Sequence, residues 1–201
     1  MQSEIEAKFI HVNHDDMRVK LKSIGAICEQ PMRLMRRVVV HNQAMTAKNA
    51  FLRVRDEGQR VTMTYKQFDD DSIDGAKELE VIVSDFDTVV ATLDEAGLAH
   101  DTYQESKREN WRVGDVEIML DEWPWLDTYM EIEGPSEILV KQTAELLGLS
   151  WDDAVFGGVA NVYLKQYPHI GDKGRQMIND SWPVIKFNDP MPELLSKKEG
   201  K

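Results

Sequence analysis

Short segments in which apolar and polar residues alternate recur along most of the chain. In the opening run SEIEAKFI, side chains two apart share one face of a strand, so Glu4, Glu6 and Lys8 lie together opposite apolar residues. Turn signals such as DEGQ and VGD separate seven further segments of this kind: MRRVVVHN, AFLRVRDE, RVTMTYKQF, AKELEVIV, YQESKRENWRV, DVEIMLDEW and TYMEIEG. The pattern predicts eight strands in an antiparallel barrel, because closure leaves no exposed edge.

Other segments have the apolar spacing of amphipathic helices. Residues 13–26, 84–98 and 135–149 each contain such a pattern and reach a glycine at its end. A fourth helix is predicted after Ser150, through WDDAVFGGVANVYLKQY, although two glycines weaken its middle. We therefore expect an α+β fold, an eight-stranded antiparallel β-barrel with helices packed on the outside.

The character of the sequence changes at Pro168. Residues 168–201 show no clear periodicity, contain four of the seven prolines and end in a charged stretch. We expect one domain over residues 1–167 and a C-terminal extension over 168–201 that packs on the domain or is partly flexible. The candidates for packing are Trp182, Val184, Ile185 and Phe187.

The composition of the chain restricts the compartment and the binding partners that we expect for the protein. With 201 residues and 42% hydrophobic content the chain can bury a core. It has no apolar run near the roughly 20 residues that cross a bilayer, and no export signal, so we expect a cytoplasmic protein without membrane contact. A single cysteine suits a reducing compartment. The formal net charge of −12 argues against general attraction to nucleic acid.

Whether the polar rows face outward or into the lumen determines whether the barrel has an apolar core or a polar binding site. Polar rows outside an apolar core are the ordinary arrangement for any one strand. If helices cover the outside, however, the apolar rows must face outward and the polar rows must line the lumen. The inward residues would then include Arg53 and Arg55, Thr62, Thr64 and Lys66, Glu78 and Glu80, and Glu131 and Glu133.

A lumen lined by both carboxylates and guanidinium groups indicates a charged ligand. Buried charges without partners cost several kcal/mol each, so such a lumen must hold water, ions and a highly charged ligand. Carboxylate oxygens are the ligands that Mg²⁺ and Mn²⁺ prefer, and the chain has no cluster of His and Cys that competes with them. Arginine and lysine match phosphate oxygens. The combination predicts a complex of polyphosphate and metal.

These residues resemble the signature of the CYTH domain, named for class IV adenylate cyclase and thiamine triphosphatase and also called the triphosphate tunnel metalloenzymes. EIEAKF carries the resemblance first, and RVR, TYK, ELE, SKRENW, IMLDEWP and MEIEG continue it in order over roughly residues 3–165. The resemblance implies an eight-stranded barrel open as a tunnel, in which a divalent metal and a triphosphate meet.

The resemblance also implies roles for single residues. The metal-binding and catalytic carboxylates would be Glu4, Glu6, Asp121, Glu131 and Glu133. The substrate-binding residues would be Lys8, Arg53, Arg55, Lys66, Glu78, Glu80 and Arg108. Within that second set, Glu78 and Glu80 would orient bases or water, and a purely structural ion pair is an equal alternative for Glu78. Lys107 alternates with Arg108 and is expected to point outward.

The sequence departs from the family pattern in two places. Family members often have a basic residue shortly before a tyrosine in the last helix, where this chain has Asn161 and Val162 before Tyr163, and Lys165 is expected on the surface. The stretch EWPWLDTY lacks a glycine pair that is common in thiamine triphosphatases, which disfavours thiamine triphosphate as the substrate.

The predicted function is that of a metal-dependent phosphohydrolase, with Mg²⁺ or Mn²⁺ as cofactor and a triphosphate as substrate. The substrate would be inorganic tripolyphosphate or a nucleoside or other organic triphosphate. Two alternatives stay open: a class IV-type adenylate cyclase that converts ATP to cyclic AMP and pyrophosphate, and a non-catalytic polyphosphate or nucleotide binder. Trp123 and Trp125 are expected to pack on the barrel, with a homodimer surface or a lid as the alternatives.

Overall fold

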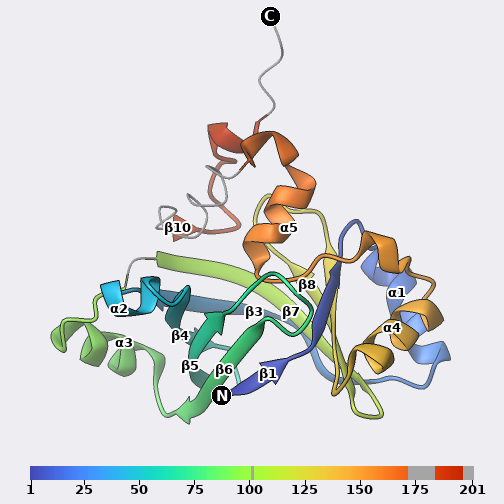
Figure 1. Cartoon of the computed structure of the whole chain (residues 1–201), viewed down its shortest axis with the longest axis horizontal. Coiled ribbons are helices and arrows are strands. Elements are labelled where there is room, and N and C mark those ends of the chain that lie inside the picture. The colour runs from blue at the N-terminus through green and yellow to red at the C-terminus, as the bar shows by residue number, and fades with distance from the viewer. Residues whose placement is uncertain (101, 172–183, 197–201) are drawn as a thin grey trace, which may run out of the picture.

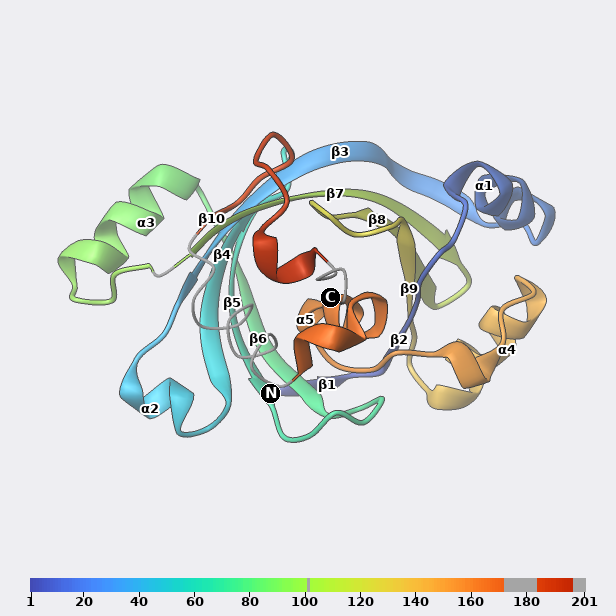
Figure 2. The ribbon, with the colours of Figure 1, turned by 90° about the horizontal axis from the view of Figure 1, so that it is seen from above.

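The computed structural model shows one antiparallel sheet that curves into a nearly closed barrel (Figures 1 and 2). It describes residues 1–100, 102–171 and 184–196. The strand order is β1-β6-β5-β4-β3-β7-β8-β9-β2. The bounds are β1 Gln2–Glu4, β2 Glu6–Phe9, β3 Ile27–Val40, β4 Ala50–Asp56, β5 Val61–Phe68, β6 Ala76–Val83, β7 Thr102–Val113, β8 Val116–Glu122 and β9 Tyr129–Glu133.

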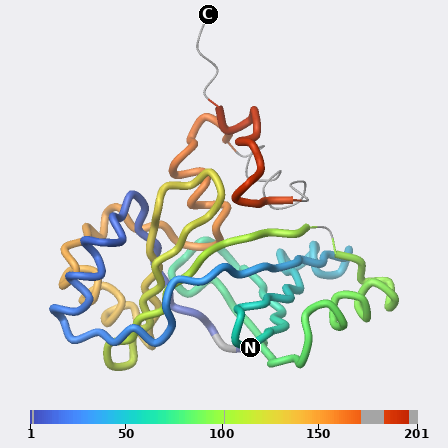
Figure 3. Tube along the Cα trace, turned by 180° about the vertical axis from the view of Figure 1, so that it is seen from behind, coloured from blue at the N-terminus to red at the C-terminus, as the bar shows by residue number. Residues whose placement is uncertain are grey.

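The predicted opening strand closes the barrel from both sides. Its first part, β1, pairs with β6, and its second part, β2, pairs with β9, with Ile5 between them. The predicted antiparallel barrel is therefore confirmed, and the eight predicted strands become nine because this strand bends at Ile5. On the far side of the barrel, β3 and β7 run together over most of their length (Figure 3).

Helices surround the barrel, as predicted (Figure 2). Helices α1 (His14–Ser23) and α4 (Glu137–Leu146) lie on one side, and α3 (Phe86–Glu95) and the short α2 (Gln43–Thr46) lie on the other. Side-chain caps start the three longer helices: Asn13 accepts from the backbone N–H of Asp16, Asp85 from that of Thr88, and Ser136 from that of Leu139.

The fourth predicted helix is interrupted. A 3-10 helix covers Trp151–Asp153, and α5 begins only at Val159 and runs to Gln166. Gly157 has φ +79°, a left-handed conformation that a continuous helix cannot contain, and Gly158 is the N-cap of α5. The prediction of one continuous helix after Ser150 was therefore wrong, because the glycine pair separates the two pieces.

The main hydrophobic core lies outside the barrel wall. Met17 and Leu21 of α1 and Val140 and Ala144 of α4 pack against the outward-facing side chains of β2, β8 and β9, among which Ile118 is fully buried. A smaller core packs Phe86 of α3 against β3 and β4. This arrangement leaves the opposite, polar face of the strands for the interior of the barrel.

Strand β5 shows the inward polar row most clearly. Thr62, Thr64 and Lys66 are all buried, at 0%, 0% and 8% exposure. The predicted direction of the rows is therefore confirmed for this strand. The helices leave part of the outside uncovered, since Leu79 and Val81 on the outer face of β6 are 56% and 51% exposed.

One opening of the barrel is covered by α5 and by part of the C-terminal extension (Figure 2). Strand β10 (Val184–Ile185) pairs in parallel with β7, and Ile185 is fully buried. Further along, the indole N–H of Trp125 donates to the Asp189 carbonyl oxygen at 3.1 Å, and Leu195 is 1% exposed. Trp182, also predicted to pack, lies outside the described residues, and the boundary at residue 168 stays a prediction. None of the helices in the described ranges is long and apolar enough to cross a membrane.

Candidate active site

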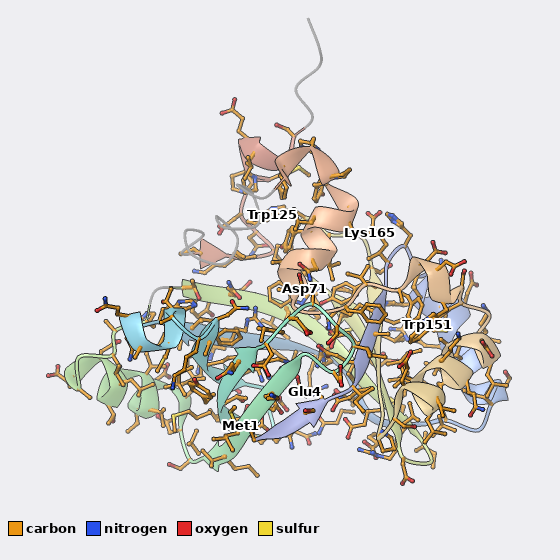
Figure 4. All side chains as sticks on the ribbon, viewed as in Figure 1. Met1, Glu4, Asp71, Trp125, Trp151 and Lys165 are labelled. Atoms are coloured by element: carbon orange, nitrogen blue, oxygen red, sulfur yellow. The ribbon has the colours of Figure 1, made fainter. Side chains whose placement is uncertain are left out.

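The inward polar rows enclose a cavity of about 410 Å³ inside the barrel. All the site residues predicted from the sequence line it except Asp121: Glu4, Glu6, Lys8, Arg53, Arg55, Lys66, Glu78, Glu80, Arg108, Glu131 and Glu133. Glu4 is marked on β1 in Figure 4. Residues from opposite ends of the sequence thus share one chamber, and their charges are unevenly distributed around it.

Carboxylates gather where β1, β2, β9 and β8 follow one another. Glu6 on β2 and Glu117 on β8 both pair in register with Glu133 on β9, so three carboxylates lie side by side across three strands. Glu131 is the next inward residue of β9, and Glu4 precedes Glu6. We call Glu4, Glu6, Glu117, Glu131 and Glu133 the acidic wall.

Most carboxylates of the acidic wall have a basic partner. The Lys8 Nζ lies 2.7 Å from Glu6 and 3.7 Å from Glu131, and these two acids raise the pKa of Lys8 against the opposing effect of burial. Glu117 pairs with Arg112 at 2.5 Å, and Glu4 pairs with Lys66. Burial alone would raise the pKa of Glu4, but Lys66 outweighs it and the net shift is downward.

Glu133 differs from its neighbours. Within the described parts of the chain its carboxylate has no hydrogen bond and no ion pair. Burial, followed by the charges of Glu4 and Glu6, raises the pKa of Glu133 to about 8. Like charges placed directly opposite each other on adjacent strands are destabilising. Among the described residues the acidic wall therefore holds one carboxyl group more than the protein pairs with basic side chains, and that group retains a proton at neutral pH.

Basic side chains form the other part of the chamber. Arg33 and Arg37 come from β3, Arg53 and Arg55 from β4, and Arg108 from β7, and we call these five the basic wall. The Nε atoms of Arg53 and Arg55 are buried and have no hydrogen-bond partner among the described residues. A buried donor without an acceptor costs free energy, so both atoms suit an anionic ligand.

Arg108 and Asp121 form the tightest pair of the basic wall. The Nε and Nη2 of Arg108 donate to the two oxygens of Asp121 at 2.7 and 2.8 Å, and Nη2 also donates to Glu131 at 2.7 Å. Asp121 is fully buried, and burial raises its pKa to about 6 despite the nearby guanidinium. In this structure Asp121 therefore orients Arg108 from behind the cavity wall, and its role as a metal ligand stays a prediction.

Glu78 and Glu80 lie where the two walls meet on β6. Burial, with the charge of Glu4, raises the pKa of Glu78 to about 7. Glu80 accepts a hydrogen bond from the Thr64 hydroxyl at 2.8 Å and lies 3.9 Å from Arg53. Outside the chamber, Lys107 pairs with Glu122 at 3.0 Å, as its predicted outward direction requires, and Lys165 is exposed (Figure 4).

Sequence reasoning missed several residues of the chamber. Glu117 alternates with Met119 and Asp121, so the period-two rule already places it on the inner face. Arg37 lies beside Arg36, and in a strand one of two adjacent arginines must face inward. Gln104 and Tyr129 also line the chamber, and the same rule places them on the inner face, because each lies an even number of residues before Arg108 or Glu131 on its strand. Trp123 lines the chamber from just beyond the end of β8.

The donor set fits a divalent cation that keeps part of its water shell. Among the described residues no three acidic, histidine or cysteine side chains form a ready-made metal cage. Mg²⁺ does not need one, because it usually binds through one or two carboxylates together with waters and substrate phosphates. Glu133, with the adjacent Glu6, supplies hard oxygen ligands at a point of excess negative charge. These residues would hold Mg²⁺ or Mn²⁺.

A family model, that of the CYTH domain, matches residues 2–155. The chain belongs to the CYTH family. The resemblance inferred from EIEAKF and the following motifs is thereby confirmed. CYTH proteins are triphosphate tunnel metalloenzymes, which implies that this family uses a divalent metal. No curated protein matches the sequence at a significant level.

Solved structures share the fold of this CYTH protein. A "putative adenylate cyclase" from Vibrio parahaemolyticus has a TM-score of 0.69 at 16% identity, covering 80% of this chain and 97% of its own. The PH1012 protein of Pyrococcus horikoshii has a TM-score of 0.63 at 23% identity, covering 75% and 93%. A "putative adenylyl cyclase" from Hippeastrum, described as having a dominant triphosphatase activity, has a TM-score of 0.53 at 14% identity, covering 79% and 91%. At these identities the likeness shows the fold alone.

Proposed function

We propose that this CYTH protein is a metal-dependent triphosphatase whose substrate binds between the two walls of the cavity. The observation that carries the proposal is the facing of an acidic and a basic wall in one chamber. A pure anion binder would gain from losing the acidic wall, which repels phosphate unless a cation lies between them. A pure cation site would have no use for five guanidinium groups.

The residues of the basic wall would bind and orient the phosphates. Arg53 and Arg55 offer buried Nε donors, and Arg108 is held in place by Asp121. Glu6 and Glu133 would hold Mg²⁺ or Mn²⁺ on the opposite side. When bound, such a cation offsets the charge that develops during phosphoryl transfer and makes a bound water more acidic.

Lys8 would help to keep the acids ionised while the site is being loaded. Its ammonium lies against both Glu6 and Glu131, and it is 2% exposed. Glu78 and Glu80 would orient water or the neighbouring bases, as the sequence predicts. In this proposal residues 1–167 are the catalytic domain; the cytoplasmic location, the homodimer and the absence of nucleic-acid binding stay predictions.

Turnover of several substrates tests the proposal. The protein is incubated in turn with inorganic tripolyphosphate, ATP and thiamine triphosphate, each with Mg²⁺ and with Mn²⁺, and the products are separated by ion-exchange chromatography. Release of inorganic phosphate from at least one triphosphate is expected. Cyclic AMP and pyrophosphate as the main products from ATP would establish the cyclase alternative. Tight binding of all three without turnover would establish the non-catalytic alternative.

A further inference from the structure

Arg36 and Arg37 are adjacent in β3, but their guanidinium groups lie in different surroundings. Both guanidinium groups lie 4.4 Å from the centre of an aromatic ring, Arg36 over Phe86 outside the barrel and Arg37 over Trp123 inside it. Both contacts favour the positive charge. The two residues differ in what else surrounds them.

Arg36 has carboxylate partners on the outside of the barrel. Its Nε donates to Asp56 at 3.1 Å, and its Nη atoms donate to Asp87 at 3.3 Å. These pairs raise the pKa of Arg36 although burial opposes them. Arg36 is therefore a satisfied ion-pairing residue that links β3 to β4 and to α3.

Arg37 has only a neutral partner. Its Nε donates to the Gln104 side-chain oxygen at 2.7 Å, and no carboxylate lies within ion-pair distance among the described residues. The other arginines of the basic wall each have one: Arg33 and Arg55 have Glu57, Arg53 has Glu80 and Arg108 has Asp121. Burial and the charges of Arg53 and Arg55 lower the pKa of Arg37.

The surroundings of Arg37 hold it in place without neutralising it. In register, Arg37 of β3 and Ile185 of β10 both pair with Gln104 of β7, so Arg37 and the extension that covers one opening of the barrel flank the same residue of β7. Trp123 and Ile185 are buried and line the same chamber. In such apolar surroundings an oriented, unpaired cation attracts an anion more strongly than it would in water.

We propose that Arg37 is a further substrate-binding residue, which binds the phosphate group lying deepest toward α5 and β10. This inference rests on the proposed triphosphatase function and adds a residue that the RVR, TYK and SKRENW motifs do not include. Trp123 and Gln104 act as positioning residues, because each holds the guanidinium and neither carries a charge. The arginine is required in preference to lysine because its planar group stacks on Trp123 while leaving N–H donors for phosphate oxygens.

The test separates binding from folding. Wild type, Arg37→Gln, Arg37→Lys and the matched control Arg36→Gln are titrated with inorganic tripolyphosphate by calorimetry, once in EDTA and once with Mg²⁺ in the cold. Thermal unfolding is recorded for each protein without ligand. Arg37→Gln is expected to weaken tripolyphosphate binding by about 10- to 100-fold, as for a lost hydrogen bond to a charged group, and Arg37→Lys by less. Arg36→Gln is expected to bind like wild type.

The unfolding curves give the second readout. The ligand-free Arg37→Gln protein is expected to unfold at a higher temperature than Arg36→Gln, because only the latter breaks ion pairs. Unchanged tripolyphosphate binding by both Arg37 variants would overturn the inference, and so would a larger loss of ligand-free stability in Arg37→Gln than in Arg36→Gln. A wild type that binds tripolyphosphate in neither medium would contradict the proposed function itself, and this inference with it.

Discussion

The acidic and basic walls of the cavity face each other, and in each of them one residue has no ion-pair partner among the described residues. In the acidic wall, Glu133 lies between Glu6 and Glu117, and no basic side chain in the described ranges pairs with it. In the basic wall, Arg37 has a glutamine and a tryptophan where its neighbours have carboxylates. The comparison teaches that, among the described residues, most charged groups of the two walls are paired within the protein, while Glu133 and Arg37 have no partner of opposite charge and are open to one from a ligand.

This difference has an energetic meaning. A buried ion pair lowers the cost of burying its two charges, whereas an unpaired buried charge retains a cost of several kcal/mol. A phosphate beside Arg37 would remove such a cost. A divalent cation beside Glu133 would replace the proton that this carboxyl, with its pKa raised to about 8, retains at neutral pH. The two unpaired residues therefore favour a ligand that carries both signs, as a complex of metal and triphosphate does.

Removal of the cation should have the largest effect. In EDTA we expect phosphate release to fall to the background rate, because the acidic wall then repels the substrate that the basic wall attracts. Circular dichroism should show a folded protein, since the external cores hold the barrel. Added Mg²⁺ or Mn²⁺ should restore turnover. Full activity in EDTA would contradict the proposal that the acidic wall binds a cation and the basic wall binds the phosphates.

The substitution Glu133→Gln should reduce turnover nearly as much as removal of the cation does. We expect turnover with Mg²⁺ to fall by at least about 10³-fold, because a metal ligand supports several kcal/mol of charge stabilisation in the transition state. Above about pH 8, where Glu133 is ionised, the ligand-free variant should unfold at a higher temperature than wild type, since the crowding of Glu6, Glu117 and Glu133 is relieved. Glu122→Gln, on the outer face of β8, is the control and should keep full turnover.

Asp121→Ala should act on stability. The substitution leaves Arg108 without its bidentate partner, and breaking a buried pair in this way costs about 3–5 kcal/mol. Urea unfolding measures the loss. Glu122→Ala, the neighbouring residue on the outer face, breaks only a partly exposed pair with Lys107 and should cost about 1 kcal/mol or less. Equal losses for the two variants would show that Asp121 does not support the basic wall.

The smallest expected effect is a pH dependence of the metal-free protein. The pKa of Glu133 is raised to about 8 and that of Glu78 to about 7, so between about pH 5 and pH 8 the folded state binds more protons than the unfolded state. Stability then falls as the pH rises through this window. The carboxyls with lowered pKa values, such as Glu57 at about 2, change stability only at lower pH.

Thermal unfolding in EDTA across this range checks the sign of the effect. Glu133→Gln should flatten the decline, and saturating Mg²⁺ should also flatten it, because the cation stabilises the ionised carboxylate. A metal-free wild type whose stability rises from pH 5 to pH 8 would contradict the assignment of excess charge to the acidic wall. Glu122→Gln again serves as the control and should follow the wild-type curve.

The sequence predicts the walls better than it predicts the pairs within them. Alternation in RVTMTYKQF places Thr62, Thr64 and Lys66 on one face, and the structure confirms that this face is internal. Period two is local, so it can be read from a few residues. The same rule applied to Asp121 gives the correct face, but it does not show that Arg108 occupies both of its oxygens.

Pairing depends on contacts between distant parts of the chain, and this limits what the sequence can predict. Arg36 and Arg37 look equivalent in MRRVVVHN, and they differ only because Asp56 and Asp87 lie outside the barrel while Gln104 lies inside. The sequence showed that Gly157 and Gly158 weaken the predicted helix. It did not show that the helix is interrupted there and begins again only at Val159. Nor did the sequence show that Ile185, from the extension, would reach the cavity.

The bend at Ile5 has a consequence for assembly. The two short strands on either side of it bind partners that are synthesised much later, Glu4 opposite Ala76 and Glu6 opposite Glu133. Contacts between residues so distant in sequence form slowly, because closing the long intervening loop costs conformational entropy before the contacts can stabilise the fold. Glu4 and Glu6 of the acidic wall flank Ile5, so they reach their positions only when the barrel closes. If they bind the cation as proposed, cation uptake during refolding would report this last step.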